Sequence, residues 1–442
     1  MKNSRKATAA VTLLIMAGEA TATIALADTS TDAATTSDAH ADSPTTTKEG
    51  GGGSLPDAGA PAVHALITFG GSTTSEMVSV NLTSKAIEGR LPFPGVGVTD
   101  TRNTLSPFLL EQNADVVAKL DPTKPWTVDS TWNVAMTDAI DGGSLYSDPA
   151  QVVVETETKA YVLRTDRNDI AVINETSDSG IPTSSISIAS FLQTGDTDGV
   201  VEMTAAAYVP ATSRLYVVLA NVNQNDEAAY GATICGSEVS TVIAINTLTD
   251  TVVSLGGTGP GGSIPLVYYN PMTAVFDATG DRLIVASAGC NAKPTAPGGA
   301  LGAVSGRGVE AVNLTTDKSA SLLSITASAF PAGFVDIPTG FAYIDSTHAI
   351  IGFDGTGQAV YNWNPTSTTI GALIPNAPDV FVYDGNGHLV GTRVDTPDAG
   401  GASSTDIVSV TVPGGVSTTL AKNVTSLTGL VYVSSVDVWP HP

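Results

Sequence analysis

Residues 273–285 read Thr273-Ala274-Val275-Phe276-Asp277-Ala278-Thr279-Gly280-Asp281-Arg282-Leu283-Ile284-Val285. Two short apolar runs flank a turn made of Asp, Thr and Gly, which is the pattern of an antiparallel β-hairpin. The first run starts with Thr and a small residue and ends in an aromatic, and we call it a type A strand. The second run follows the turn, and we call it a type B strand. The fold is decided by how often this pair recurs.

Both strand types recur along the chain. Further type A strands are Thr204–Tyr208, Thr339–Tyr343 and Thr428–Tyr432, with looser copies at Gln151–Val154 and Asp379–Tyr383. Further type B strands are Lys159–Leu163, Arg214–Val218 and His348–Ile351. After residue 62 no convincing amphipathic helix interrupts them, so we expect an all-β domain.

A third apolar run, type C, ends in Asn or Asp and is usually followed by Thr two residues later. The polar residues at this position are Asn81, Asp121, Asn174, Asn246, Asn313 and Asn364. Their side chains can accept a hydrogen bond from a backbone N–H two residues on, which closes a turn into a fourth strand, type D. Several of them match the N-glycosylation sequon, but their recurrence at one position favours the turn interpretation.

Four antiparallel strands repeated along a chain are typical of a β-propeller. The units resemble those of the YVTN-repeat and YncE-like surface proteins, which are seven-bladed propellers, over residues from about 63 to 435. The resemblance implies a fold and says little about function.

Counting strands gives an internal check on the ring. Six complete units are found near residues 95–136, 148–192, 202–257, 271–326, 337–375 and 377–424. The start of the domain supplies only three strands, near Ala62–Phe69, Met77–Val80 and Ile87–Phe93, and the end supplies a lone type A strand, Leu427–Val433. We therefore predict a seven-bladed β-propeller with four antiparallel strands per blade, closed by a C-terminal strand that completes the first blade.

Composition excludes two classes of protein. The 442 residues contain 19 Lys and Arg against 43 Asp and Glu, a formal charge of −24. This sign of charge repels polyphosphate, so we expect no nucleic-acid partner. The 42% hydrophobic and 14% charged residues exclude an ordinary disordered chain.

The N-terminus predicts export. Residues 1–27 combine basic residues, an apolar stretch over Ala7–Gly18 and the small-residue cleavage site Ala25-Leu26-Ala27. The apolar stretch is too short for a transmembrane helix. Glu19 stands where a bacterial lipobox needs Cys, so a thioether lipid anchor is excluded at that position. The expected location is extracellular, cell-surface or periplasmic.

Residues 28–61 are rich in Thr, Ser, Ala, Asp and Gly and have almost no large apolar side chain. Such a segment cannot bury enough surface to fold, so we expect a disordered acidic linker. The propeller then occupies residues 62–442.

The connections from D to A and from B to C share one face of a propeller. The long insertions fall in these connections, at Gln224–Val239, Gly256–Pro265, Cys290–Arg307 and Asp395–Asp406. Loops held by a rigid scaffold carry many binding sites, so this face is the expected binding surface, with solvated padding as the alternative. Cys235 and Cys290 lie in two of the insertions, and in an exported protein they favour a disulfide over separate thiols.

Asp196, Asp198 and Glu202 are the candidate metal ligands. Alternating carboxylates around Gly199 suit a hard cation such as calcium, although Thr194 and Ala205 exclude an EF-hand at this position. The alternative is an ordinary acidic turn.

A second candidate site is a ring of polar residues where type A strands begin, at the mouth of the central channel. These residues are Asp148, Asn270, Asp336, Asn376 and Asp379. Propellers of the gluconolactonase and quinoprotein types place ligands there, but this chain has no motif specific to either. The alternative is that the side chains cap strand ends and hold water.

The leading functional hypothesis is a secreted or cell-surface, non-enzymatic propeller that binds a protein or small-molecule ligand on the insertion-bearing face. One alternative is a metal-dependent, lactonase-like hydrolase with a cation in the central channel. Another is a structural surface-layer or matrix component. The sequence has no nucleophile elbow, zincin motif or P-loop, and calcium is the one cofactor that it suggests.

Overall fold

A computed structural model describes most of the chain from residue 62 onward. The described residues are 62–71, 74–102, 105–135, 146–177, 179–294, 301–325, 338–353, 359–395, 404–422, 424–425, 427 and 432–440. The predicted signal peptide and linker, residues 1–27 and 28–61, lie outside the described residues.

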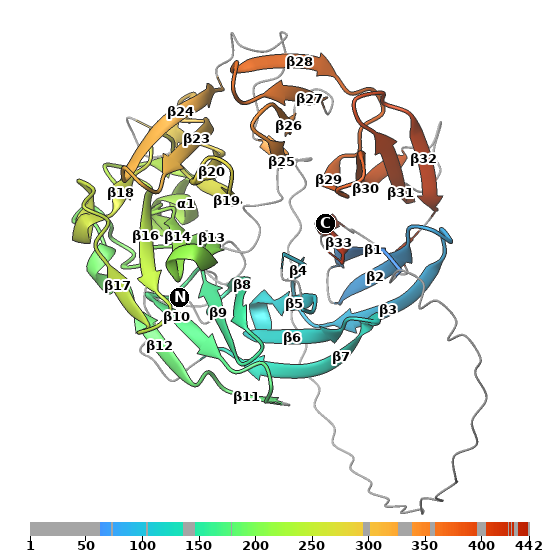
Figure 1. The fold of residues 1–442 in the computed structure, drawn as a ribbon, viewed down its shortest axis with the longest axis horizontal. Coiled ribbons are helices and arrows are strands. Elements are labelled where there is room, and N and C mark those ends of the chain that lie inside the picture. Colours follow the sequence, from blue (N-terminus) through green and yellow to red (C-terminus); the bar gives the residue numbers. More distant parts are fainter. Residues whose placement is uncertain are drawn as a thin grey trace, which may run out of the picture.

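The described strands form a ring of sheets around a central axis (Figure 1). Seven sheets have four or five strands and an eighth has three. In each larger sheet four propeller strands pair antiparallel in the order A, B, C and D, with strand A innermost and strand D at the rim; in the first sheet strand A is the last strand of the chain. The predicted class, an all-β propeller, is confirmed.

The first three propeller sheets have the following strands. The first has β33 (Tyr432–Trp439), β1 (His64–Gly70), β2 (Ser75–Asn81) and β3 (Ile87–Phe93). The second has β4 (Gly97–Asp100), β5 (Phe108–Glu111), β6 (Val116–Asp121) and β7 (Lys124–Asn133), extended by β11 (Ser179–Gly180). The third has β8 (Pro149–Thr156), β9 (Lys159–Arg164), β10 (Asp169–Ile173) and β12 (Ser184–Ser187).

Four more propeller sheets follow in chain order. The fourth has β13 (Met203–Val209), β14 (Arg214–Leu219), β16 (Thr241–Asn246) and β17 (Thr251–Val253), with β18 (Ile264–Pro265) on β16. The fifth has β19 (Pro271–Asp277), β20 (Arg282–Ser287), β23 (Gly308–Asn313) and β24 (Lys318–Ser324). The sixth has β25 (Pro338–Asp345), β26 (His348–Phe353), β27 (Ala359–Asn364) and β28 (Thr369–Leu373). The seventh has β29 (Val380–Tyr383), β30 (His388–Asp395), β31 (Ser404–Thr411) and β32 (Ser417–Ala421).

The remaining elements are short. The three-stranded sheet has β15 (Ile234–Cys235), β21 (Cys290–Ala292) and β22 (Val304–Ser305). The described residues include one α-helix, α1 (Gln224–Tyr230), and 3₁₀ turns at Gln112–Ala114, Ala189–Phe191, Pro210–Thr212 and Pro260–Gly262. The sequence did not predict α1. No helix in the described part of the chain is long and apolar enough to cross a membrane.

The closing strand completes the first sheet and extends further toward the C-terminus than predicted. β33 pairs antiparallel with β1, from His64 opposite Trp439 to Gly70 opposite Tyr432. The strand ends at Trp439, so the expected end at Val433 was wrong, and residues 428–431 of the expected range lie outside the described residues. The strand continues through Ser434 and Ser435 because both hydroxyls bond inside the ring: Ser434 Oγ donates to Thr68 Oγ1 at 2.7 Å and Ser435 Oγ lies 2.7 Å from the same atom.

The polar residues that end the type C strands close turns, as predicted. In each case the side-chain Oδ1 accepts a backbone N–H two residues later, at 2.7–3.0 Å in five of the turns and 3.1 Å in the sixth. These residues are Asn81, Asp121, Asn174, Asn246, Asn313 and Asn364. The turn residues are set by local chemistry, which is why the sequence pattern was reliable here.

The apolar core lies between neighbouring sheets. Trp132 of β7 is fully buried in one cluster with Val152 of β8 and Ala160 of β9. Trp439 of β33 packs in another with Leu109 of β5 and donates Nε1–H to the carbonyl oxygen of Pro122 at 2.9 Å. These large side chains therefore hold adjacent blades together.

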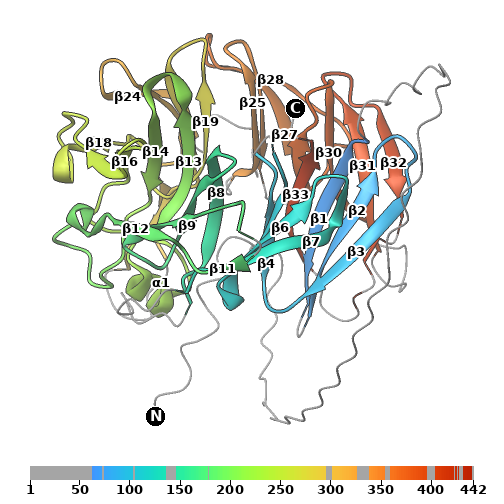
Figure 2. The same cartoon turned by 60° about the horizontal axis from the view of Figure 1, so that its bottom comes forward.

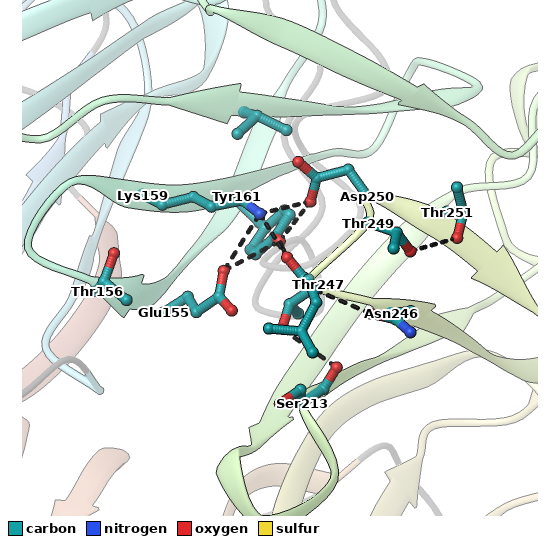
Figure 3. A network of polar contacts seen from close by, with 12 residues as sticks. Glu155, Thr156, Lys159, Tyr161, Ser213, Asn246, Thr247, Thr249, Asp250 and Thr251 are labelled. Atoms are coloured by element: carbon teal, nitrogen blue, oxygen red, sulfur yellow. Dashed lines mark hydrogen bonds and ion pairs between the residues drawn. The ribbon is translucent and has the colours of Figure 1, made fainter.

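A polar network ties the third sheet to the fourth at the ring face that carries the A–B and C–D turns (Figure 3). Lys159 Nζ donates to the carbonyl oxygen of Thr247 at 2.6 Å and pairs with Asp250 Oδ1 at 2.7 Å. The Tyr161 hydroxyl donates to the same Asp250 oxygen at 2.7 Å, and Lys159 reaches Glu155 Oε2 at 3.4 Å. The two sheets are thus joined by directional contacts in addition to apolar packing.

Candidate binding face and acidic cluster

Two insertions from neighbouring blades fold together into one platform on the face that carries the B–C and D–A connections. The first insertion contains α1 and β15, and the second contains β21 and β22. β15 pairs parallel with β21, and Lys293 Nζ lies 2.7 Å from Asp226 Oδ2 of α1. Figure 2 shows α1 beyond the strand ends on this face. We call the described parts of these insertions, residues 224–235, 290–294 and 301–305, the platform.

A disulfide joins the two halves of the platform. Cys235 of β15 and Cys290 of β21 are bonded, with their Cα atoms 5.0 Å apart. The predicted pairing is confirmed. Asn223 caps α1, since its side chain accepts from the backbone N–H groups of Asn225 and Asp226, and Gly231 ends the helix with a left-handed φ of 69°.

The other two insertions extend existing sheets. In Gly256–Pro265, strand β18 pairs with the start of β16, next to the platform insertion that precedes β16. In Asp395–Asp406, the ends of β30 and β31 pair from Asp395 opposite Ser404, and residues 396–403 lie outside the described residues.

Beside the platform, the connection from β12 to β13 gathers three carboxylates. Asp196, Asp198 and Glu202 each place a carboxylate oxygen within 4.8 Å of the others. Asp198 is buried, and Glu202 is only 2% exposed. The three candidate metal ligands are therefore brought together, in the only such group in the described part of the chain.

This acidic connection is bonded to the platform at its junction with β14. The backbone N–H of Val222 donates to Glu202 Oε2 at 2.9 Å, and that of Gln224 donates to Asp198 Oδ2. Asn223 Nδ2 donates to Thr197 Oγ1 at 2.8 Å. The position of the platform is thus coupled to the geometry of the carboxylates.

Glu202 occupies a position that repeats in the neighbouring blades. Asp148, Glu202 and Asn270 each stand directly before an innermost strand, with φ of 47°, 41° and 52°. Their carbonyl oxygens accept from Thr165, Ala220 and Ala288 respectively, each at 2.9 Å. Asp and Asn tolerate a left-handed φ, whereas Glu is unusual there. Glu202, which was predicted as a metal ligand, therefore occupies the same position before its strand as Asp148 and Asn270, which were predicted to form the polar ring.

Asp148 belongs to a second acidic group on the same face. Burial raises the pKa of Asp148 to about 8, and the charge of Asp166 and a hydrogen bond to it add to the shift, with Asp115 contributing less. Asp115 Oδ1 accepts from the Ser147 hydroxyl at 2.7 Å, and Gln224 Nε2 of α1 donates to Asp166 Oδ1 at 2.7 Å. This group therefore also contacts the start of the platform.

The other predicted ring residues are distributed over separate blades. Asn270 precedes β19 and is partly buried, and Asn376 is exposed before β29 with φ of 58°. The backbone N–H of Asp379 donates to the carbonyl oxygen of Thr392 at 2.7 Å, next to β29. Asp336 lies outside the described residues.

Sequence reasoning missed Asp115 and Asp166. Both follow type B strands, so they lie on the same face as the strand starts that were considered. Both could have been predicted, because every B–C turn lies at the same end of the ring as the D–A turns, and Asp115 and Asp166 are in B–C turns.

No protein-family model and no curated protein sequence matches the chain. Among solved structures, a Lactobacillus plantarum protein is 14% identical, with a TM-score of 0.49 over 85% of this chain and 99% of that one. A candidate 6-phosphogluconolactonase from Bacteroides fragilis is 12% identical, with a TM-score of 0.48 over 83% and 95%. AztD from Citrobacter koseri is 11% identical, with a TM-score of 0.44 over 85% and 99%. We therefore base the function on this chain's own residues.

Proposed function

We propose that this protein is an exported, non-enzymatic propeller that binds a protein or small-molecule partner through the insertion-bearing face. The observation that carries the proposal is the platform. The described parts of two insertions from adjacent blades are joined to each other by strand pairing, an ion pair and a disulfide. Ordering a surface before a partner arrives lowers the entropy lost on binding.

Three further observations support the proposal. The repeat units resemble those of YVTN and YncE-like surface propellers. The first residues have the pattern of a secretory signal, and the disulfide suits an oxidising compartment. The seven larger sheets form the scaffold, so the platform can vary in sequence without changing the fold.

The proposal is tested with labelled, full-length purified protein added to intact cells and isolated cell envelope of the producing organism. The platform variant combines Ala229→Arg with Leu301→Arg, because both positions are exposed there. The control combines Leu248→Arg with Val416→Arg, which adds the same charge at exposed C–D turns on the opposite face. We expect the platform variant to bind about tenfold more weakly and the control to bind like wild type.

Equal binding by both variants would contradict a site on the platform. Ordered sheets or filaments formed by the purified protein alone would instead favour the structural surface-layer alternative. Hydrolysis of a lactone that stops when metal is removed would favour the hydrolase.

A further inference from the structure

Two carboxylate oxygens of the acidic cluster have no hydrogen-bond donor in the described part of the chain. They are Glu202 Oε1 and Asp196 Oδ2, and both atoms are inaccessible to solvent. The partner oxygen Glu202 Oε2 accepts from Val222, and Asp196 Oδ1 accepts from Asp198 and Gly199 at 3.1 and 3.2 Å. Each side chain is therefore held by one oxygen while the other remains without a donor.

Of these two carboxylates, that of Glu202 gives the stronger evidence for a bound cation, because it is the more deeply buried. The residue is only 2% exposed, and a carboxylate oxygen of its side chain lies within 4.8 Å of one from Asp196 and one from Asp198. A buried carboxylate without a donor is costly unless something of opposite charge meets it. The side chain thus points into a cluster of its own sign.

The neighbouring charges offer Glu202 no compensation. Burial raises the pKa of Glu202 well above its ordinary value, and the charges of Asp198, Asp196 and Asp166 raise it further. Burial also raises the pKa of Asp198 to about 7, with Asp196 adding to the shift. The repulsion between three carboxylates this close is relieved either by protonation or by a bound cation.

The chemistry of the ligands selects the kind of cation. Carboxylate oxygens are hard ligands, which favour Ca²⁺, Mg²⁺ or Mn²⁺ over metals bound by His or Cys. The cluster contains three acidic groups in a single short connection, and Ca²⁺ accepts such irregular oxygen sets because it tolerates six to eight ligands. Backbone carbonyls or water can supply the remaining ligands.

We propose that Asp196, Asp198 and Glu202 bind one Ca²⁺ ion, which neutralises the cluster and fixes the connection between β12 and β13. The ion takes up the free oxygens Glu202 Oε1 and Asp196 Oδ2. Because Val222 and Gln224 donate to the same carboxylates, the bound ion also holds the base of the platform. The site does not depend on what the platform binds: it would remain if the proposed partner binding failed.

The test is calorimetric titration of the full-length protein with CaCl₂ after dialysis against EDTA. Glu202→Gln removes one charge at constant size, and Glu157→Gln makes the same change at an exposed turn on the opposite face. We expect one Ca²⁺ per chain for wild type and the Glu157 variant, with affinity at least about tenfold weaker for Glu202→Gln.

Thermal melting gives an independent readout with opposite signs. Ca²⁺ at about 100 times the wild-type Kd should raise the Tm of wild type by about 3–6 °C and that of Glu202→Gln by about half as much or less. In EDTA the order should reverse, with Glu202→Gln melting above wild type because it lacks the uncompensated buried charge.

If Glu202→Gln does not fold, Asp196→Asn serves in its place, because Asn keeps the oxygen that accepts from Asp198 and Gly199. The proposal is overturned if wild type binds no Ca²⁺, or if the folded variant binds it as tightly as wild type.

Discussion

At the residue scale, the polar side chains of this protein fall into two groups. Some close local turns, and others are buried with too few hydrogen-bond donors. The six Asn and Asp residues after type C strands accept nearby N–H groups and need nothing else. Asp148 and Glu202 differ, since each is buried beside other carboxylates and has an oxygen without a donor among the described residues. Such groups make stability depend on protons or ions.

Replacing Asp148 by Asn should stabilise the protein at high pH. The pKa of Asp148 is raised to about 8 in the folded state, above its unfolded value of about 3.9. Its contribution to stability is therefore complete below pH 4 and is lost as the pH rises to about 8. Asn keeps the left-handed φ of 47° and can donate to Asp166 at every pH.

The measurement is the Tm of wild type and Asp148→Asn between pH 5 and 8.5. The difference should be small at pH 5 and favour the variant by a few degrees at pH 8.5. Asp129→Asn, at an exposed position of β7, is the control and should show no such trend. A constant difference across the range would show that Asp148 titrates normally.

At the element scale, the strands were predicted well and the exceptions have physical reasons. Strands inside one blade are local hairpins, so turn residues and apolar runs locate them. The end of β33 was placed too early because its partner, β1, lies more than 360 residues away and its serines bond inside the ring. The seven-residue α1 was missed because it is too short to show helical periodicity, leaving its caps, Asn223 and Gly231, as the signals.

Removing the disulfide should loosen the platform and lower overall stability. The bond closes a loop of 55 residues, so the double variant Cys235→Ser, Cys290→Ser should lose about 2–4 kcal/mol of unfolding free energy. Urea unfolding measures this loss, and limited proteolysis should show faster cleavage between residues 224 and 235. Reductant should shift wild type toward the variant and leave the variant unchanged. A variant as stable as oxidised wild type would mean that strand pairing alone holds the platform.

At the scale of the whole molecule, the ring could be predicted from the sequence, but the candidate site could be predicted only in part. The fold can be recognised from the sequence because one four-strand unit is repeated, and each copy shows the same order of apolar runs and turns. The acidic cluster was found as a sequence pattern. Its hydrogen bonds to the start of the platform, and the shared strand-start position of Glu202, Asp148 and Asn270, depend on how distant segments fold together. Non-repeated contacts leave no periodic signal.

Deleting residues 427–442 should abolish cooperative folding. Without β33 the first sheet would keep three strands and the inner edge of β1 would lose its partner. An unpaired edge at the ring closure also promotes aggregation. Thermal melting by circular dichroism tests the deletion, with removal of residues 1–61 as a control that should melt like wild type. Unchanged melting of the C-terminal truncation would refute the contribution of β33.

The pairing of β1 with β33 also determines how the protein responds to mechanical force. His64 lies opposite Trp439, so the two chain ends leave the ladder at the same end. A pull applied to both ends would peel the strands apart one hydrogen-bonded pair at a time rather than slide them past each other. Tension between these two ends would therefore act on the seam between β1 and β33 one hydrogen-bonded pair at a time.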